Sequence, residues 1–221
     1  VFGLDVEWRG SDEKFDEGMV GFAERVAAAV AVGSERCCTW IPPASDVPTA
    51  EWTDRTVSRF QKIMDVLNAN GVRLGLEFVG PHHLRAGGAN AMGIFPTIWT
   101  LEQTLELINA IATDGLGLLV DSYHLDTTST DADALLPLGD ALIVHAHIND
   151  AGSETTAETA LDGNRVLPGA GRLALQHYVD VLKAIGYNGF LCCEVLTPTP
   201  LGETPTAAAI NIRESLRMLG V

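Results

Sequence analysis

Apolar runs of strand character alternate along this chain with longer segments of helical period, and no other feature limits its possible folds as strongly. The strand candidates are Val1–Val6, Arg36–Ile41, Val72–Phe78, Leu116–Val120, Ala141–His147 and Gly189–Val195. The helix candidates are Asp16–Ala31, Glu51–Asn68, Leu101–Ala112, Leu173–Ile185 and Pro205–Leu219. Most of the strand candidates are continuously apolar, which is typical of strands covered on both faces. The pattern predicts parallel βα units in a single α/β domain that spans residues 1–221.

Two architectures fit parallel βα units: a barrel and a doubly wound open sheet. The glycine-rich phosphate loops that mark many doubly wound sheets follow none of the strand candidates. Residues capable of chemistry stand at or just after the strand ends instead, and they are Glu77, Asp121, His124, His147 and Glu194. Functional groups at the carboxyl ends of several strands are typical of a (β/α)8 TIM barrel. Because we find six strand candidates instead of eight, we expect a barrel whose first two βα units are absent from this chain.

The charge balance limits the partners of the protein. Its 29 acidic and 14 basic side chains give a formal net charge of −15, which repels nucleic acid and anionic membranes. We find no signal peptide and no apolar stretch near the roughly 18 residues that span a bilayer, so we expect a cytoplasmic protein. The adjacent pairs Cys37-Cys38 and Cys192-Cys193 lack metal or redox spacing, and we expect reduced cysteines buried in strands.

Four of the strand-end residues are potential metal ligands: Glu77, Asp121, His147 and Glu194. Any one of them could be a buried acid bonded to backbone amides, or a core histidine. Four in succession are better explained by one shared partner, because buried carboxylates need a counter-charge and the basic residues lie mostly on predicted helices. We therefore predict one divalent cation. Oxygen-rich ligation favours Mn²⁺, Mg²⁺ or Co²⁺, with Zn²⁺ also possible.

Five segments that contain these residues resemble the xylose-isomerase-like barrel superfamily. The segments are Gly75–Pro81, Asp121–His124, His145–Asp150, Asn164–Gly171 and Gly186–Glu194. Within the superfamily they are most similar to the sugar phosphate isomerase/epimerase group, which includes ketose 3-epimerases, hydroxypyruvate isomerase and inosose dehydratase. The resemblance runs from about Val1 to the C-terminus and corresponds to the third to eighth βα units of the family.

The resemblance implies roles for individual residues. Glu77, Asp121, His147 and Glu194 match the metal ligands of the family, and Glu77 and Glu194 also match the groups that exchange the substrate proton. His124 matches a histidine that holds a substrate oxygen. Arg165 matches an arginine that binds substrate hydroxyls, although a longer loop separates it from His147 than in the ketose epimerases. From its position at a strand end, Trp40 is expected to form a wall of the substrate pocket.

These observations predict a divalent-metal-dependent isomerase or epimerase of a sugar, sugar phosphate or related polyhydroxy ketone. The metal would stabilise an enediolate, and a glutamate would act as the base. A lyase on the same site, such as an inosose-type dehydratase or a glycoside-eliminating enzyme, is the main alternative, and a non-catalytic carbohydrate-binding barrel is a remote one. The DNA-repair endonuclease branch is disfavoured, since Asp150–Gly171 contains no Asp-x-His motif. The sequence leaves open whether the protein forms a homo-oligomer.

Overall fold

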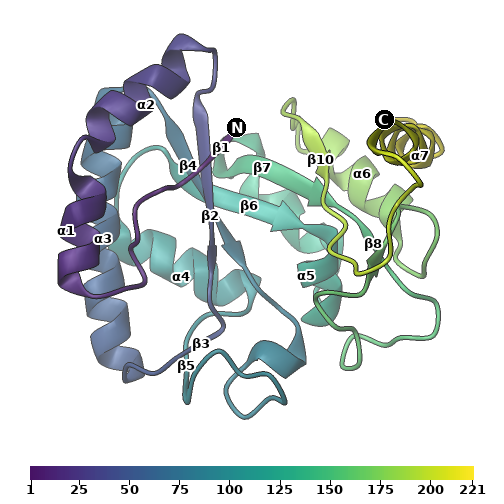
Figure 1. Cartoon of the computed structure of the whole chain (residues 1–221), viewed down its shortest axis with the longest axis horizontal. Coiled ribbons are helices and arrows are strands. Elements are labelled where there is room, and N and C mark those ends of the chain that lie inside the picture. Colours follow the sequence, from purple (N-terminus) through teal and green to yellow (C-terminus); the bar gives the residue numbers. More distant parts are fainter.

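A computed structural model describes all residues of the chain, 1–221, and its centre is one curved parallel sheet (Figure 1). The strands are β1 (Phe2–Gly3), β2 (Arg36–Ile41), β4 (Arg73–Phe78), β6 (Leu116–Asp121), β7 (Ile143–Ile148) and β10 (Leu191–Cys193). They lie side by side in the order β1-β2-β4-β6-β7-β10, and every neighbouring pair is parallel. The two outer strands, β1 and β10, do not pair with each other. The prediction of an incomplete TIM barrel is therefore confirmed.

Helices follow most of the strands, and their apolar side chains pack with those of the sheet to form the core. The longer ones are α1 (Asp12–Met19), α2 (Phe22–Ala31), α3 (Thr49–Ala69), α4 (Leu101–Ile111), α6 (Leu175–Ala184) and α7 (Pro205–Arg217). Helices α3 and α4 pack on β4. One face of α3, with Phe60, Ile63, Met64 and Leu67, is fully buried in a cluster of 34 residues. None of the helices has the length and apolar character needed to cross a membrane.

The shorter elements lie in the loops between these units. They are the helix α5 (Ser122–Thr127), three short 3-10 helices (His82–Leu84, Ala132–Leu138 and Asp140–Leu142), and the strand pairs β3 (Ala44–Ser45) with β5 (Phe95–Pro96) and β8 (Asp150–Ala151) with β9 (Arg165–Val166). Both strand pairs are antiparallel. None of these elements was predicted, because each is too short to show a periodic apolar pattern.

Three expectations differ from the structure. The single helix predicted over Asp16–Ala31 is two helices, α1 and α2, because Gly21 between them adopts a left-handed conformation with φ of 65°. The strands predicted over Val1–Val6 and Gly189–Val195 are limited to Phe2–Gly3 and Leu191–Cys193. The burial expected for both cysteine pairs is confirmed for Cys37 alone: Cys38 and Cys193 are half-buried, and Cys192, on the edge strand β10, is exposed.

The register of the sheet brings the predicted site residues to one edge. Trp40 on β2 lies opposite Glu77 on β4, and Asp121 on β6 lies opposite His147 on β7. All four residues occupy the carboxyl-terminal part of their strands. In a curved parallel sheet these ends face a common space, so the main-chain pairing alone gathers the functional side chains.

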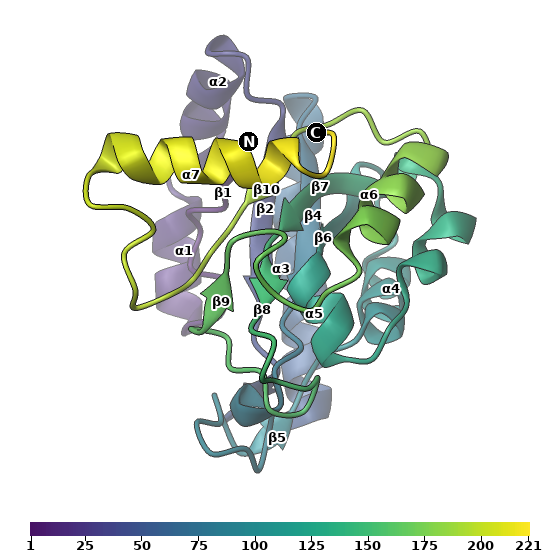
Figure 2. The same ribbon diagram turned by 90° about the vertical axis from the view of Figure 1, so that its right-hand side faces the viewer.

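Asp150 fixes the two ends of the long loop that follows β7. Its buried carboxylate accepts hydrogen bonds from the backbone N–H groups of Gly169, Gly171 and Leu173, at 3.0, 3.0 and 2.9 Å. The two ends of the loop lie so close together that a Cβ on Gly171 would be 2.0 Å from the carbonyl oxygen of Ala151. Between these tied ends, β8 and β9 pair and place Arg165 opposite Ala151 (Figure 2).

We predict that Asp150→Asn loosens this loop. The amide nitrogen of asparagine cannot accept from the backbone N–H groups, and a buried donor left unpaired costs about 1–3 kcal/mol. The free energy of unfolding should fall by that amount, and limited proteolysis should cut faster between residues 152 and 168. Glu154→Gln, an exposed change in the same loop, is the control. Equal behaviour of the two variants would show that Asp150 does not hold the loop.

Candidate active site

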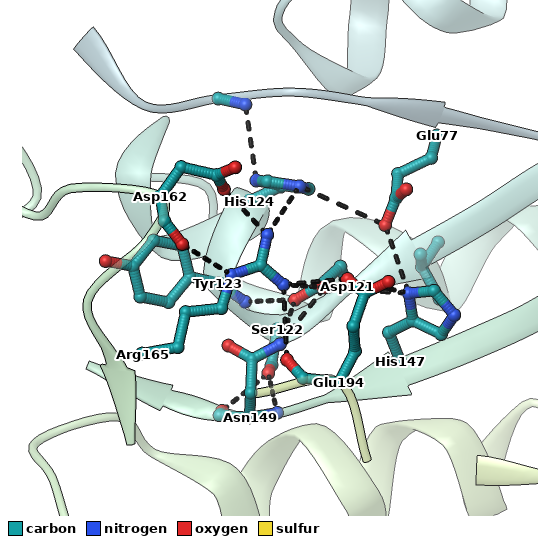
Figure 3. A network of polar contacts seen from close by, with 12 residues as sticks. Glu77, Asp121, Ser122, Tyr123, His124, His147, Asn149, Asp162, Arg165 and Glu194 are labelled. Carbon is teal, nitrogen blue, oxygen red and sulfur yellow. Dashed lines mark hydrogen bonds and ion pairs between the residues drawn. The ribbon is translucent and has the colours of Figure 1, made fainter. Parts of the chain in front are cut away.

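Four side chains converge at the carboxyl ends of β4, β6, β7 and β10 (Figure 3). They are the predicted ligands Glu77, Asp121, His147 and Glu194, and each offers one ligand atom within 4.8 Å of the others. Nδ1 of His147 lies 3.2 Å from Oε1 of Glu77, 3.8 Å from Oδ2 of Asp121 and 3.4 Å from Oε2 of Glu194. The structure thus brings the whole predicted set together around one point.

Two atoms of this cluster lack hydrogen bonds. Oε1 of Glu77 and Nδ1 of His147 are buried, and although they lie close to each other, neither has a hydrogen-bond partner. An unpaired buried polar atom is costly, and most such atoms in proteins are paired. A divalent cation between them would satisfy both atoms and would find one imidazole nitrogen and three carboxylate oxygens. The donor set of the site therefore fits a metal ion.

The electrostatics of the cluster also favour a cation. Burial raises the pKa of the Glu77 carboxyl, because it penalises the charged form. Burial alone would lower the pKa of His147, but the carboxylates of Glu194 and Glu77 outweigh this effect and raise it to about 10. Without a metal, His147 thus holds a proton among carboxylates. A bound cation would take the place of that proton.

Asp121 is held by several donors. Its Oδ1 accepts from the backbone N–H of Tyr123 at 2.7 Å, and the side-chain amide of Asn149 donates to both of its oxygens at 3.0 and 3.1 Å. Burial opposes ionisation of Asp121, yet the charge of Arg165 keeps its pKa below the usual value. Asn149 was not singled out in the sequence. Its position two residues after His147, directly after the end of the same strand, is the signal that could have identified it.

His124 lies on α5 and turns one ring nitrogen toward the cluster. The backbone N–H of Gly80 donates to its Nδ1 at 3.4 Å in the neutral tautomer whose proton sits on Nε2, and in the other tautomer Nε2 would accept from Nη2 of Arg165, also at 3.4 Å. That nitrogen lies 4.0 Å from Oε1 of Glu77. Only glycine fits at position 80, since a Cβ there would be 2.4 Å from the hydroxyl of Thr127. In the tautomer that accepts from Gly80, His124 presents an N–H donor beside the ligand cluster.

The guanidinium of Arg165 is almost fully engaged by carboxylates. Nη1 donates to Oδ2 of Asp121 at 3.0 Å and to Oε2 of Glu194 at 2.9 Å. Nη2 donates to Oδ1 of Asp162 at 2.7 Å, and Nε donates to the backbone oxygen of Asp162 at 3.2 Å. The remaining N–H of Nη2 lies 3.4 Å from Nε2 of His124. The long loop thus brings Arg165 to the cluster, where it contacts two of the predicted ligands.

A cavity of about 240 Å³ opens beside the cluster. It is lined by Trp40, Glu77, Val79, Met92, His124, Asp162, Arg165, Glu194 and Leu196. Trp40 thus lies in the pocket wall, and the guanidinium of Arg9 stacks 4.2 Å from its ring while also covering Trp8. A larger cavity of about 310 Å³ lies near α5 and α6, but none of the four clustered residues lines it.

The chain is similar in sequence to curated proteins from several bacteria. It is 29% identical over 137 residues to inosose isomerase of Bacillus velezensis, which covers 62% of this chain and 44% of that protein. It is 28% identical over 143 residues to inosose isomerase of Bacillus subtilis, covering 65% and 47%. The chain therefore spans about half the length of the curated relatives it matches.

Solved structures match nearly the whole chain. A xylose isomerase domain protein from Alicyclobacillus acidocaldarius has a TM-score of 0.89 and 32% identity, covering 98% of this chain and 75% of that one. The IolI protein, crystallised with a zinc atom, has a TM-score of 0.78 and 23% identity, covering 99% and 74%. The family model for the xylose isomerase-like TIM barrel matches residues 3–219. On this match and on the half-barrel that carries the site, the protein belongs to the xylose isomerase-like TIM barrel family.

Proposed function

We propose that this chain forms the catalytic part of a divalent-metal-dependent isomerase or epimerase that acts on a polyhydroxylated ketone. The observation that carries the proposal is the convergence of Glu77, Asp121, His147 and Glu194, with two buried atoms left unpaired. Similarity to inosose isomerases supports an isomerase in preference to a lyase on the same site. The ligand set favours Mn²⁺, Mg²⁺ or Co²⁺, and the zinc in the IolI structure supports Zn²⁺ as the alternative.

The metal, when bound, would supply Lewis-acid polarisation of a substrate carbonyl, which acidifies the neighbouring C–H group. Glu77 and Glu194 both line the pocket, and they come from strands that are not neighbours in the sheet. We propose that one glutamate removes the proton and that the other returns one, giving an enediolate between the two steps. Two bases that approach from different sides invert the carbon, whereas a single base would return the proton to the face it left.

His124 and Arg165 supply donors for the oxygens of the substrate. Nε2–H of His124 and the remaining Nη2–H of Arg165 lie side by side, and both residues line the pocket. A carbonyl or hydroxyl oxygen placed between them would accept from both, and such donors stabilise charge that develops on oxygen. We propose that Trp40 packs against the carbon skeleton of the substrate.

We predict that metal binding strengthens as the pH rises. The metal needs a neutral imidazole, and the pKa of His147 is raised to about 10, so binding must displace a proton throughout the range from pH 6 to 8. The apparent affinity should rise about tenfold per pH unit for each proton displaced. Calorimetric titration with Mn²⁺ at several pH values measures this slope. His147→Ala should abolish the site, and the surface change His82→Ala should leave it unchanged. A flat profile would contradict the prediction.

We predict that Glu77→Gln and Glu194→Gln each slow exchange of the substrate proton. Glutamine keeps the shape and one oxygen ligand but loses basicity, and a general base contributes about 10²–10⁴-fold. NMR in D₂O should show loss of exchange next to the carbonyl of an inosose, while the metal content of each variant stays largely intact. The same spectra would reveal elimination products of a lyase. Wild-type exchange rates in both variants would remove the glutamates from the mechanism.

We predict that His124→Ala lowers turnover without loss of metal. Its imidazole presents a donor to the pocket and is not one of the four clustered ligand residues. Loss of one such donor typically costs about 10²–10³-fold in kcat. Metal content measured by atomic emission should match that of His82→Ala, an exposed histidine outside the cluster that serves as control. Metal loss confined to the His124 variant would place this histidine among the ligands.

A further inference from the structure

We infer that the pocket accepts an uncharged polyhydroxylated ketone and rejects its phosphorylated counterpart, and that Asp162 sets this preference. The inference rests on the proposed function, because it concerns the substrate of the same site. It narrows that function in one respect, the charge of the substrate. Three features of the structure lead to it: the charge of the pocket wall, the engagement of its donors, and the place of Asp162.

The pocket wall is acidic. Glu77, Asp162 and Glu194 line the cavity, and Arg165 is the one lysine or arginine that does. Asp121 lies directly behind Arg165, in contact with its guanidinium. With a divalent cation bound, these four carboxylates still exceed the positive charge of the cation and Arg165 by one unit. A phosphate group would add up to two further negative charges to this wall.

Most of the donors that could hold a phosphate are already engaged. Phosphate sites use arginine forks or free backbone N–H groups at helix N-termini and glycine-rich turns. Here the fork of Arg165 donates to carboxylates. The N–H of Tyr123, in the first turn of α5, donates to Asp121, and the N–H groups of Gly169 and Gly171 donate to Asp150. Carboxylates of the protein thus fill the places that an anionic ligand would need.

Two further arginines near the pocket are occupied by neutral oxygens of the protein, and the unpaired Nε of Arg9 is buried away from solvent. Arg9, which stacks on Trp40, donates to the hydroxyl of Thr39 at 2.9 Å and to the backbone oxygen of Trp40. Arg85 donates to the carbonyl oxygens of Gly80 and Thr127. A hydroxyl or carbonyl oxygen needs fewer donors, and the adjacent N–H groups of His124 and Arg165 are enough for it.

Asp162 is the carboxylate whose removal tests the repulsion between the pocket wall and a phosphate group. It lies on the long loop, lines the pocket and accepts from Arg165, but it is not one of the four clustered ligands. Its side chain is 24% exposed, so it can change without a cavity forming in the core. Asp162→Asn keeps an oxygen that accepts from Arg165 and removes one negative charge from the wall. Glu158→Gln, an exposed change in the same loop, removes the same charge away from the pocket.

The test compares D-fructose with D-fructose 6-phosphate, in which a phosphate ester replaces the 6-hydroxyl while the open-chain forms present the same ketone. Calorimetry on the metal-loaded protein gives both affinities, and proton exchange in D₂O is followed for both compounds. We expect the wild type to bind fructose at least about tenfold more tightly than the phosphate, because like charges in a partly buried site repel strongly. Asp162→Asn should narrow this ratio by about tenfold, on the same electrostatic ground, and Glu158→Gln should leave it unchanged.

Two results would overturn the inference. The first is a wild type that shows no preference for fructose, including one that binds neither compound. The second is an affinity ratio of fructose to its phosphate that falls by the same factor in Asp162→Asn and in Glu158→Gln. Failure of the proposed function has a different signature: a preference for fructose that depends on Asp162, without proton exchange in any of the tested ketones, would leave the charge selection standing and remove the isomerase chemistry.

Discussion

The mutual repulsion of carboxylates gathered in a small, partly buried space is the constraint around which this site is built. Glu77, Asp121 and Glu194 surround one imidazole, and each would be costly to bury alone. The protein offsets part of this cost with its own groups, because Asn149 and Arg165 donate to Asp121. What is left unpaired, at Glu77 and His147, is the position suited to a cation.

Much of this arrangement could be predicted from the sequence, because the apolar runs show where each strand ends. A carboxylate or histidine that closes an apolar strand must lie at the carboxyl edge of a parallel sheet, and this reasoning placed Glu77, Asp121, His147 and Glu194 correctly together. The incomplete barrel followed from the six strand candidates in the same way. These features depend on periodicity and order along the chain, which one sequence displays directly.

Features that depend on contacts across loops could not be predicted. No pattern indicates that Asp150 ties amides 19 to 23 residues away, or that Asp162 pairs with Arg165. The break between α1 and α2 depends on the conformation of a single glycine, which a helical apolar pattern conceals. The exposure of Cys192 depends on which strand lies at the edge of the sheet, a property of the whole fold that is absent from the local sequence.

The loop closed by Asp150 separates two properties that are usually coupled, the placement of a site residue and the length of the segment that carries it. Arg165 is positioned by its pairing with Ala151, so residues 153–158 do not set its location. Doubling the length of a flexible loop costs only about 0.6 kcal/mol. Insertions in that segment could therefore accumulate during evolution and reshape the pocket entrance, while the charged centre below kept its geometry.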